Sequence, residues 1–414
     1  MDASVVYIVG AARTPVGQFD GPLSGMEAVE LGAAAIKGAV ERSRVPPEMA
    51  SHVYMGQALQ AGAGQSPSKQ AAILAGLSDT IEATTINKVC ASGLKAVTLA
   101  AQEILLGYGS VLVAGGMESM SRVPLYAKRG SAVDKEEALD GVNKDGLQNP
   151  YDGLSMGACA DILADRFHLS RKSQDEYALT TFRRASQAVE MEMFEDEIVP
   201  VTCQSGKSAK VSSDDIRSGG IFQRLSTLST PFSASGTVTA GSACTMADGA
   251  SAVVLTNAQV ARKYCRDNRM LARIVSFADA AAKPIEFAIS PAKAVKLALQ
   301  RAQLSVDQIS FWELNEAFAA VVQITQQVSH KHASFWNMTI TLLGLEANKV
   351  NVSGGAIAFG HPLGSSGCRI LVSLLHQLTP GQYGVAAICN AGGGATAMVV
   401  QRLEAGSLGD PIGS

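Results

Sequence analysis

Two cysteines and a histidine stand in sequence surroundings that suit acyl-transfer chemistry. The first, Cys90, falls where an expected strand (82–89) meets the start of an expected helix (91–106). The free N–H groups and positive dipole end of a helix start lower the pKa of a thiol, which favours the nucleophilic thiolate. A buried structural cysteine is the commoner interpretation of a free thiol taken alone.

The second cysteine and the histidine both lie beside glycine-rich turns. Cys389 ends an apolar strand and precedes NAGGG, whose backbone N–H groups could converge on an oxyanion or could simply allow tight packing. His361 lies in GGAIAFGHPLGSSG, where the glycines are expected to leave the imidazole open to a substrate. With an ordinary pKa of about 6.5, this ring could take a proton from a thiol, and the alternative is a loop histidine bonded to a carbonyl.

Asn315 follows an expected strand (311–314), and α/β sheets place their sites at such strand ends. It could hold a water or a carbonyl there, or it could cap the next helix. A cysteine hydrolase needs one thiol and completes its reaction with water. Two thiols with a histidine and an asparagine therefore favour thioester chemistry.

Composition excludes several other classes of protein. The chain has 414 residues, 47% apolar and 17% charged, which is not the composition of a disordered chain. A net charge of −3 gives no basic field for nucleic acid or an anionic membrane. No apolar run approaches the ~18 residues of a membrane span, and MDASVVYIVGAARTP is expected to be neither a signal nor a transit peptide. The seven cysteines form no CxxC pair, which argues against zinc or a disulfide framework and favours a reducing compartment.

Short apolar strands alternate with amphipathic helices, which predicts an α/β fold with a sheet covered on both faces. The stretch 122–234 is more charged and loop-like, with one clear helix (172–190) capped by Ser170. In both cysteine motifs, a strand is expected to meet the start of a helix. This likeness suggests that the chain contains a duplicated α/β unit. The expected elements outside that stretch are 5–9, 26–45, 82–89, 91–106, 111–114, 251–256, 272–277, 291–302, 311–314, 370–378, 384–388 and 397–401.

The motifs NKVCASG, GGMESMS, NEAF, GGAIAFGHPLGSSG and CNAGGG occur in the order found in the thiolase family, and the chain resembles that family over essentially its whole length. The resemblance implies a five-layered αβαβα fold built from two similar halves with an inserted loop region. The implied division is 1–121 with 235–270 for the N-terminal half, 122–234 for the inserted loop region and 271–414 for the C-terminal half.

Within the family, the chain is most similar to acetoacetyl-CoA thiolases of the mitochondrial, potassium-stimulated type. The implied reaction is the reversible thiolysis of acetoacetyl-CoA to two acetyl-CoA through an acetyl-cysteine. Coenzyme A is then a substrate, no prosthetic group is needed, potassium is an implied ligand, and the chain forms a homodimer or homotetramer in the mitochondrial matrix or cytosol. The alternatives are a broad-range 3-ketoacyl-CoA thiolase, a 2-methylacetoacetyl-CoA thiolase, a ketoacyl synthase and a thiolase-like lipid-binding or scaffold protein.

The resemblance also implies a role for individual residues. Cys90 matches the acylated nucleophile, Cys389 the acid/base at the acetyl methyl carbon, and His361 the base that activates Cys90. His361 and a water held by Asn315 match a first oxyanion hole, and the N–H groups of Cys90 and Ala391 match a second. The matches to the coenzyme A and substrate contacts are Ser155, Met156, Arg217, Ala240, Cys244, Ala317 and Phe318, and those to the potassium ligands are Tyr151, Ala240, Gly241, Ala243 and Ile357.

Three features depart from the family pattern. Ser155 stands where acetoacetyl-CoA thiolases usually have a histidine beside the thioester, and Cys244 replaces a serine that contacts coenzyme A. The chain is also longer than the pattern within 328–343, which puts the docking of the following helix in doubt.

Overall fold

Strands from both halves of the chain pair in one sheet. The computed structural model describes residues 5–130, 138–203, 209–217, 220–265, 272–327 and 343–408. The N-terminal strands lie in the order β1 (Val6–Arg13), β10 (Ala247–Asn257), β5 (Val111–Ser119), β3 (His52–Gly56) and β4 (Glu82–Ile86), and β2 (Gly17–Gln18) pairs with β10. The C-terminal strands follow as β11 (Ala272–Ala281), β14 (Gly394–Arg402), β13 (Tyr383–Asn390) and β12 (Ile309–Leu314). Three residues of β1 pair with β11 and join the halves.

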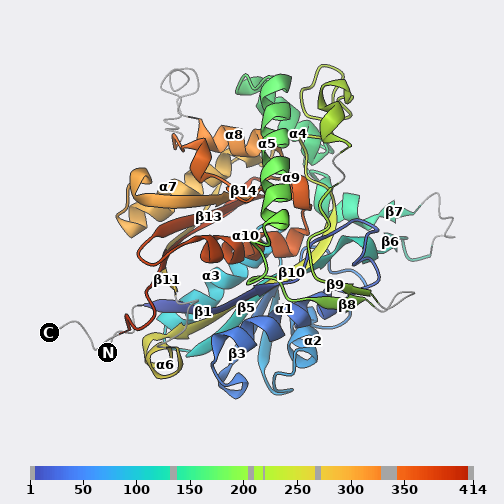
Figure 1. The fold of residues 1–414 in the computed structure, drawn as a ribbon. Helices are drawn as coiled ribbons and strands as arrows, with labels where there is room; N and C mark the ends of the chain where they lie inside the picture. Colours follow the sequence, from blue (N-terminus) through green and yellow to red (C-terminus); the bar gives the residue numbers. More distant parts are fainter. Residues whose placement is uncertain are drawn as a thin grey trace.

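Helices separate and cover the two halves of this sheet (Figure 1). In the middle layer, α3 (Ser92–Leu105) packs on α10 (Leu363–Gln377), and α10 also contacts β5, β10 and β13. The outer helices are α1 (Ala28–Ser43) and α2 (Pro67–Leu74) on the N-terminal side and α7 (Ser290–Ala302) on the C-terminal side. The predicted αβαβα layering is therefore confirmed.

The inserted region contains more structure than the sequence predicted. Ser170 caps α5 (Arg171–Glu190) as expected, because its hydroxyl accepts from the Ser173 N–H at 3.0 Å. A second helix, α4 (Met156–Arg166), was not predicted. The remaining strands and helices are β6 (Leu125–Tyr126), β7 (Leu139–Asp140), β8 (Val201–Cys203), β9 (Ala209–Val211), α6 (Ala258–Tyr264), α8 (Ala319–Gln326) and α9 (Ala356–Phe359). The short turns are Pro47–Met49, Met120–Arg122, Asn143–Leu147, Phe222–Thr227, Pro284–Ile289, Val306–Gln308 and Ala347–Lys349.

Several predicted boundaries were wrong, and glycines explain one of them. Strand β5 continues through Gly115 and Gly116 because a Cβ atom on Gly116 would lie 2.0 Å from the Gly364 carbonyl oxygen, so only glycine lets α10 approach the strand. Helix α10 likewise begins at Leu363, seven residues before the range predicted from 370. The extra segment expected within 328–343 falls almost entirely on residues outside those the structure describes.

The duplicated strand-to-helix junction is also wrong at its second copy. Cys389 lies inside β13, and the turn after it leads into the antiparallel strand β14 rather than into a helix. The resemblance between the two cysteine motifs is thus local and reflects glycine-rich turns of different geometry.

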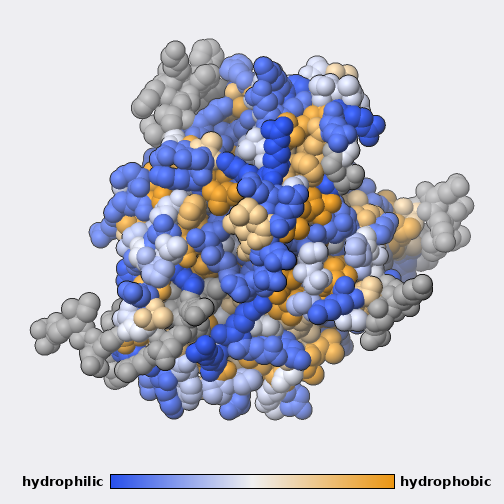
Figure 2. Space-filling model, in the orientation of Figure 1, coloured by the Kyte–Doolittle hydropathy of each residue, from blue (hydrophilic) through white to orange (hydrophobic). Residues whose placement is uncertain are grey.

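Hydrophilic side chains predominate on the face drawn in Figure 2, with apolar patches between them. Within the described ranges, no helix combines the length and apolar character needed to cross a bilayer.

Candidate active site

Cys90 stands in a tight, strained turn between β4 and α3. Its neighbour Val89 has a φ of +48°, a left-handed conformation that is rare for a β-branched residue. The Ser92 hydroxyl donates to the Val89 carbonyl at 2.5 Å and accepts from the Lys88 N–H at 2.8 Å, and so holds the turn closed. Strain of this kind, of order 1–3 kcal/mol, is common where a backbone must present a reactive group.

The Cys90 thiol is not a stabilised thiolate in the unliganded site. Helix α3 begins only at Ser92, and Cys90 is just 9% exposed. Burial raises the pKa of the thiol to about 11, although the N–H groups of Ala391 and of Cys90 itself approach the sulfur and lower it. The predicted lowering of this pKa is therefore wrong, because desolvation outweighs the effect of the two N–H groups. The two N–H groups nevertheless converge where the second oxyanion hole was expected.

His361 is enclosed rather than open to solvent, contrary to expectation. It is 3% exposed, and its backbone N–H donates to the Thr245 carbonyl at 2.8 Å. On the ring, Nδ1 lies 2.6 Å from the Ser366 hydroxyl and Nε2 lies 3.5 Å from Asn315 Nδ2. Burial, with a contribution from the charge of Arg369, lowers the pKa of His361 to about 3, so the ring is neutral near pH 7.

Asn315 lies at the end of β12, where the sequence placed it. Its backbone N–H donates to the Ala387 carbonyl at 3.0 Å, which fixes it against the neighbouring strand. Among the described residues, its buried Oδ1 atom has no hydrogen-bond partner. The alternative of a helix cap is excluded, because the residue that precedes α8 is Phe318. A buried amide oxygen without a partner is suited to hold a water.

Three thiols lie within electrostatic range of one another. Cys389, only 1% exposed, has a pKa raised well above its ordinary value by burial, and negative charge on Cys90 or Cys244 raises it further. Burial raises the pKa of Cys244 to about 12, although Cys244 is the most exposed of the seven cysteines. Its backbone N–H donates to the Ala317 carbonyl at 3.0 Å.

Several of the predicted substrate contacts line one cavity of about 180 Å³. The cavity contains Ser155, Met156, Cys244 and Phe318 together with His361. The Ser155 hydroxyl also caps α4 by accepting from the Ala158 N–H at 3.2 Å. The other lining residues are Met120, Asn143, Leu147, Gly157, Phe232, Ala243, Thr245, Met246 and Leu363, of which only Ala243 had a role assigned from the sequence.

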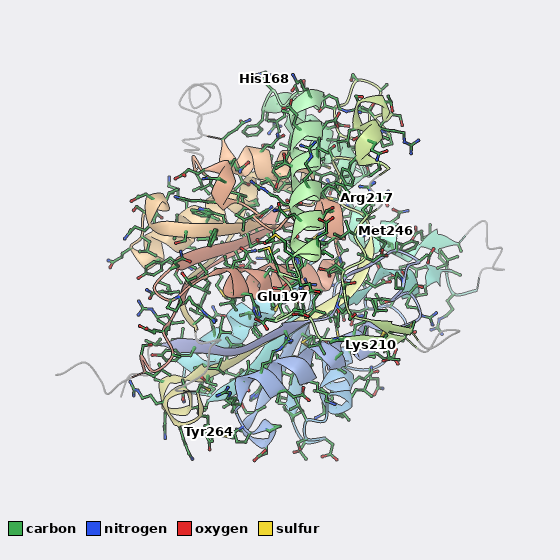
Figure 3. All side chains as sticks on the ribbon, in the orientation of Figure 1. His168, Glu197, Lys210, Arg217, Met246 and Tyr264 are labelled. Atoms are coloured by element: carbon green, nitrogen blue, oxygen red, sulfur yellow. The ribbon has the colours of Figure 1, made fainter. Side chains whose placement is uncertain are left out.

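The remaining predicted contacts lie around this cavity. Arg217 Nη1 donates to the Ala243 carbonyl at 3.2 Å, and Figure 3 shows Arg217 and the cavity residue Met246 on the same side of the molecule. Ala317 is buried beside Cys244, whereas Ala240 is exposed.

The predicted potassium ligands are brought together only in part. Gly241 lies beside Leu225, and Ile357 belongs to the same hydrophobic cluster as Leu225, but Tyr151 is 74% exposed. The Ala243 carbonyl already accepts a hydrogen bond from Arg217, whose positive charge disfavours a second cation at that oxygen. These contacts do not fit a potassium ion at Ala243.

Two residues near the site were missed by sequence reasoning. Ser366 lies in the first turn of α10, five residues after His361. This short separation from a candidate catalytic histidine could have identified Ser366 in the sequence. Glu118 of the GGMESMS motif is fully buried and accepts from the N–H groups of Ala58, Leu59 and Gly364. Burial raises the pKa of Glu118 to about 7, and its negative charge raises the pKa of Cys90.

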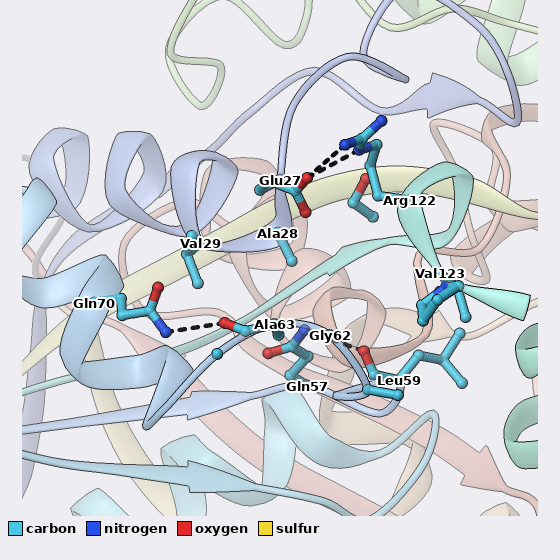
Figure 4. Close-up of a pocket in the computed structure, with 14 residues that line it drawn as sticks. Glu27, Ala28, Val29, Gln57, Leu59, Gly62, Ala63, Gln70, Arg122 and Val123 are labelled. Atoms are coloured by element: carbon cyan, nitrogen blue, oxygen red, sulfur yellow. Dashed lines mark hydrogen bonds and ion pairs between the residues drawn. The ribbon is translucent and has the colours of Figure 1, made fainter. Parts of the chain in front are cut away.

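A second cavity, of about 490 Å³, lies between the loop after β3 and the start of α1 (Figure 4). It is lined by polar groups that already pair: Arg122 with Glu27 at 2.9 Å, and Gln70 with the Ala63 carbonyl at 2.9 Å. It contains none of the predicted site residues and has no cysteine or histidine in its lining.

Alkylation of Cys90 by iodoacetamide in the unliganded protein is expected to accelerate about tenfold per pH unit from pH 7 to pH 10. A raised pKa leaves little thiolate at neutral pH, and the reactive fraction grows with pH until the pKa of about 11 is reached. Mass spectrometry of the Cys90 peptide measures the rate, with buried Cys265 as the internal control. A plateau below pH 8 would show that Cys90 is instead a stabilised thiolate.

Comparisons with known proteins agree with this geometry. Residues 6–259 match the model of the thiolase N-terminal domain, and residues 268–402 match that of the thiolase C-terminal domain. Mitochondrial acetyl-CoA acetyltransferases of Gibberella zeae and Homo sapiens are 50% and 43% identical, each over 96% of this chain and 91% and 90% of their own length. The crystal structure of an Ascaris suum thiolase in complex with coenzyme A is 35% identical with a TM-score of 0.87, and covers 97% of this chain and 100% of that one. The chain is therefore a member of the thiolase family.

Proposed function

We propose that this chain is an acetyl-CoA C-acetyltransferase that cleaves acetoacetyl-CoA with coenzyme A into two acetyl-CoA, and that also runs the reverse Claisen condensation. The observation that carries the proposal is the convergence at Cys90 of two backbone N–H groups and a second thiol, Cys389, beside a cavity that His361 lines. Its volume of about 180 Å³ is small beside the roughly 300–1,000 Å³ of ordinary ligand pockets, which suits a short acyl group. The acetyl-CoA acetyltransferase names of the relatives agree with this activity.

In the first half-reaction, the Cys90 sulfur attacks the 3-keto carbon while His361 Nε2 takes its proton. The raised pKa of Cys90 and the lowered pKa of His361 make a preformed ion pair unfavourable, so proton transfer accompanies attack. The N–H groups of Cys90 and Ala391 form one oxyanion hole, and His361 with a water on Asn315 forms the other. The carbon–carbon bond then breaks, and Cys389 protonates the methylene of the leaving acetyl-CoA.

In the second half-reaction, the Cys389 thiolate takes the proton of the coenzyme A thiol as its sulfur attacks the acetyl-Cys90 thioester. The bond between the acetyl carbon and the Cys90 sulfur breaks, acetyl-CoA leaves, and His361 returns its proton to Cys90. The walls of the channel for the pantetheine are formed by Met156, Phe318, Cys244 and Ala317. Ser155 lies at the acyl end of this channel, and Arg217 and Ala240 lie at its mouth. No step uses a metal ion.

Substrate range tests this proposal against its two nearest alternatives. Acetyl-CoA formation is measured from acetoacetyl-CoA, from 2-methylacetoacetyl-CoA and from 3-ketoacyl-CoA esters of increasing length. We expect kcat/KM to be highest for acetoacetyl-CoA and to fall steeply with chain length. A flat profile would favour a broad-range 3-ketoacyl-CoA thiolase, and a preference for the branched ester would favour the 2-methyl alternative.

Ser155→His is expected to lower the turnover of 2-methylacetoacetyl-CoA relative to acetoacetyl-CoA by several-fold. The imidazole would fill cavity volume that a methyl branch can occupy, and burying one methyl is worth about 0.8 kcal/mol. Ser155→Ala is the matched control, because both variants lose the cap of α4 at a cost of about 1 kcal/mol, but only histidine fills the pocket. An unchanged or higher ratio in Ser155→His would mean that Ser155 does not shape specificity.

We further propose that the chain self-associates as a homodimer or homotetramer. We also propose that it acts in mitochondria, the location that the names of its relatives state for them. Strand β4 ends the sheet and pairs only with β3 among the described strands, which leaves an edge for a second copy. Sedimentation velocity separates monomer, dimer and tetramer.

A potassium dependence stays a prediction, which assays in potassium and in a bulky organic cation would decide.

A further inference from the structure

We infer that Ser366 is a positioning residue that holds His361 in the tautomer protonated at Nδ1, so that the lone pair of Nε2 faces the reacting groups. The inference rests on the proposed function only for its kinetic consequence, because the tautomer itself is a property of the unliganded protein.

The Ser366 hydroxyl has one proton and two neighbours that could use it. Its Oγ lies 3.0 Å from the Pro362 carbonyl oxygen and 2.6 Å from His361 Nδ1. A carbonyl oxygen can only accept, so this contact is a hydrogen bond only if the hydroxyl donates to it. The hydroxyl then has only lone pairs left for the ring, and Nδ1 must carry the hydrogen that fills the shorter contact.

The orientation of the Asn315 amide on the opposite side of the ring is compatible with the same arrangement. Asn315 Nδ2, which can only donate, faces His361 Nε2 at 3.5 Å, at the long end of the hydrogen-bond range. With the amide in this orientation, a protonated Nε2 would direct N–H against N–H. The contacts of Ser366 with Pro362 and His361 carry the assignment of the tautomer.

The surroundings keep this arrangement in place. Ser366 is 2% exposed in the first turn of α10, and the His361 backbone is anchored to Thr245, so neither partner has room to turn away. Arg369, one helical turn further along, disfavours the doubly protonated ring. A neutral imidazole with a free Nε2 is the form that a general base at a thiol requires.

The tautomer can be read directly by nitrogen NMR on protein labelled in its histidine rings, with His361→Gln identifying the His361 signals among the six histidines. We expect Nδ1 of His361 to carry the hydrogen in the wild-type protein and Ser366→Ala to give a mixture of tautomers. Ser365→Ala is the matched control, because Ser365 is equally buried on the same turn but bonds to Ser251 instead. A wild-type ring protonated at Nε2, or a Ser366→Ala ring with an unchanged tautomer, would overturn the inference.

The kinetic readout is the rate of Cys90 acetylation by acetyl-CoA, followed by mass spectrometry. We expect a tenfold to hundredfold loss in Ser366→Ala with KM nearly unchanged, and wild-type behaviour in Ser365→Ala. Equal losses in both serine variants would mean a structural effect of α10 and would overturn the positioning role. A wild-type protein that forms no acetyl-CoA from acetoacetyl-CoA would contradict the proposed function, and the NMR result would still decide the tautomer.

Discussion

Cys90→Ser is expected to lower the thiolysis of acetoacetyl-CoA by at least 10⁴-fold, about 5.5 kcal/mol of transition-state stabilisation. A hydroxyl is a far weaker nucleophile than a thiol, and the site offers only a neutral, buried imidazole with a pKa of about 3 to activate it. The serine fits the turn, so the folded state should be retained.

Mass spectrometry after treatment with acetoacetyl-CoA checks the same assignment chemically. The wild-type protein should gain one acetyl group on the Cys90 peptide, and Cys90→Ser should gain none there. Cys265→Ser serves as the control, because this thiol is also buried but donates to the Ser43 carbonyl, far from the cavity. Acetylation that persists on another cysteine in Cys90→Ser would make that residue the acyl carrier.

The convergence of Cys90, Asn315 and Ala391 could be predicted because each of these residues follows a strand. Ala391 and Cys90 are separated by most of the chain, yet the Ala391 N–H reaches the Cys90 sulfur. Asn315 follows β12 as predicted, and its amide meets His361. Alternating apolar strands and helices predicted the layered fold, since that pattern depends on burial rather than on exact boundaries.

The electrostatics of the site could not be predicted, because they depend on the depth of burial. The sequence indicated that Cys90 follows a strand and precedes a helix, but not that layers on both sides exclude water. Desolvation then raises the pKa of Cys90 and lowers that of His361, opposite to the expected activated thiol. These two pKa values belong to the unliganded site, and a charged substrate or a bound water changes them only once it enters the cavity.

Local backbone features were also hidden from the sequence. Nothing about valine predicts the left-handed φ of Val89, which the Ser92 hydroxyl and the Asn87 side chain stabilise from outside. Helix α4 was missed because it is short and has little polar contrast, although Ser155 at its start is a typical N-cap. The division at residues 121, 234 and 270 stays a prediction.

The most informative prediction concerns Cys389, because it separates the two thiols. Cys389→Ser should slow condensation of two acetyl-CoA by about 10³-fold, within the range for loss of a general base. The acetylation of Cys90 by acetyl-CoA should fall far less, because that step depends on His361 and the two N–H groups near the sulfur rather than on Cys389. Since Cys389 is 1% exposed inside β13, the smaller hydroxyl should fit without moving the strand.

Cys368→Ser is the matched control for Cys389→Ser, because it also places a hydroxyl at a fully buried thiol, on α10 rather than in the site. Burst-phase acetylation and steady-state condensation are measured on both variants. If Cys389 moves the proton of the acetyl methyl group, only condensation is lost, and only in Cys389→Ser. Near-wild-type condensation in that variant would refute the role, and an equal loss of both steps would mean that Cys389 supports the geometry around Cys90 rather than the proton transfer.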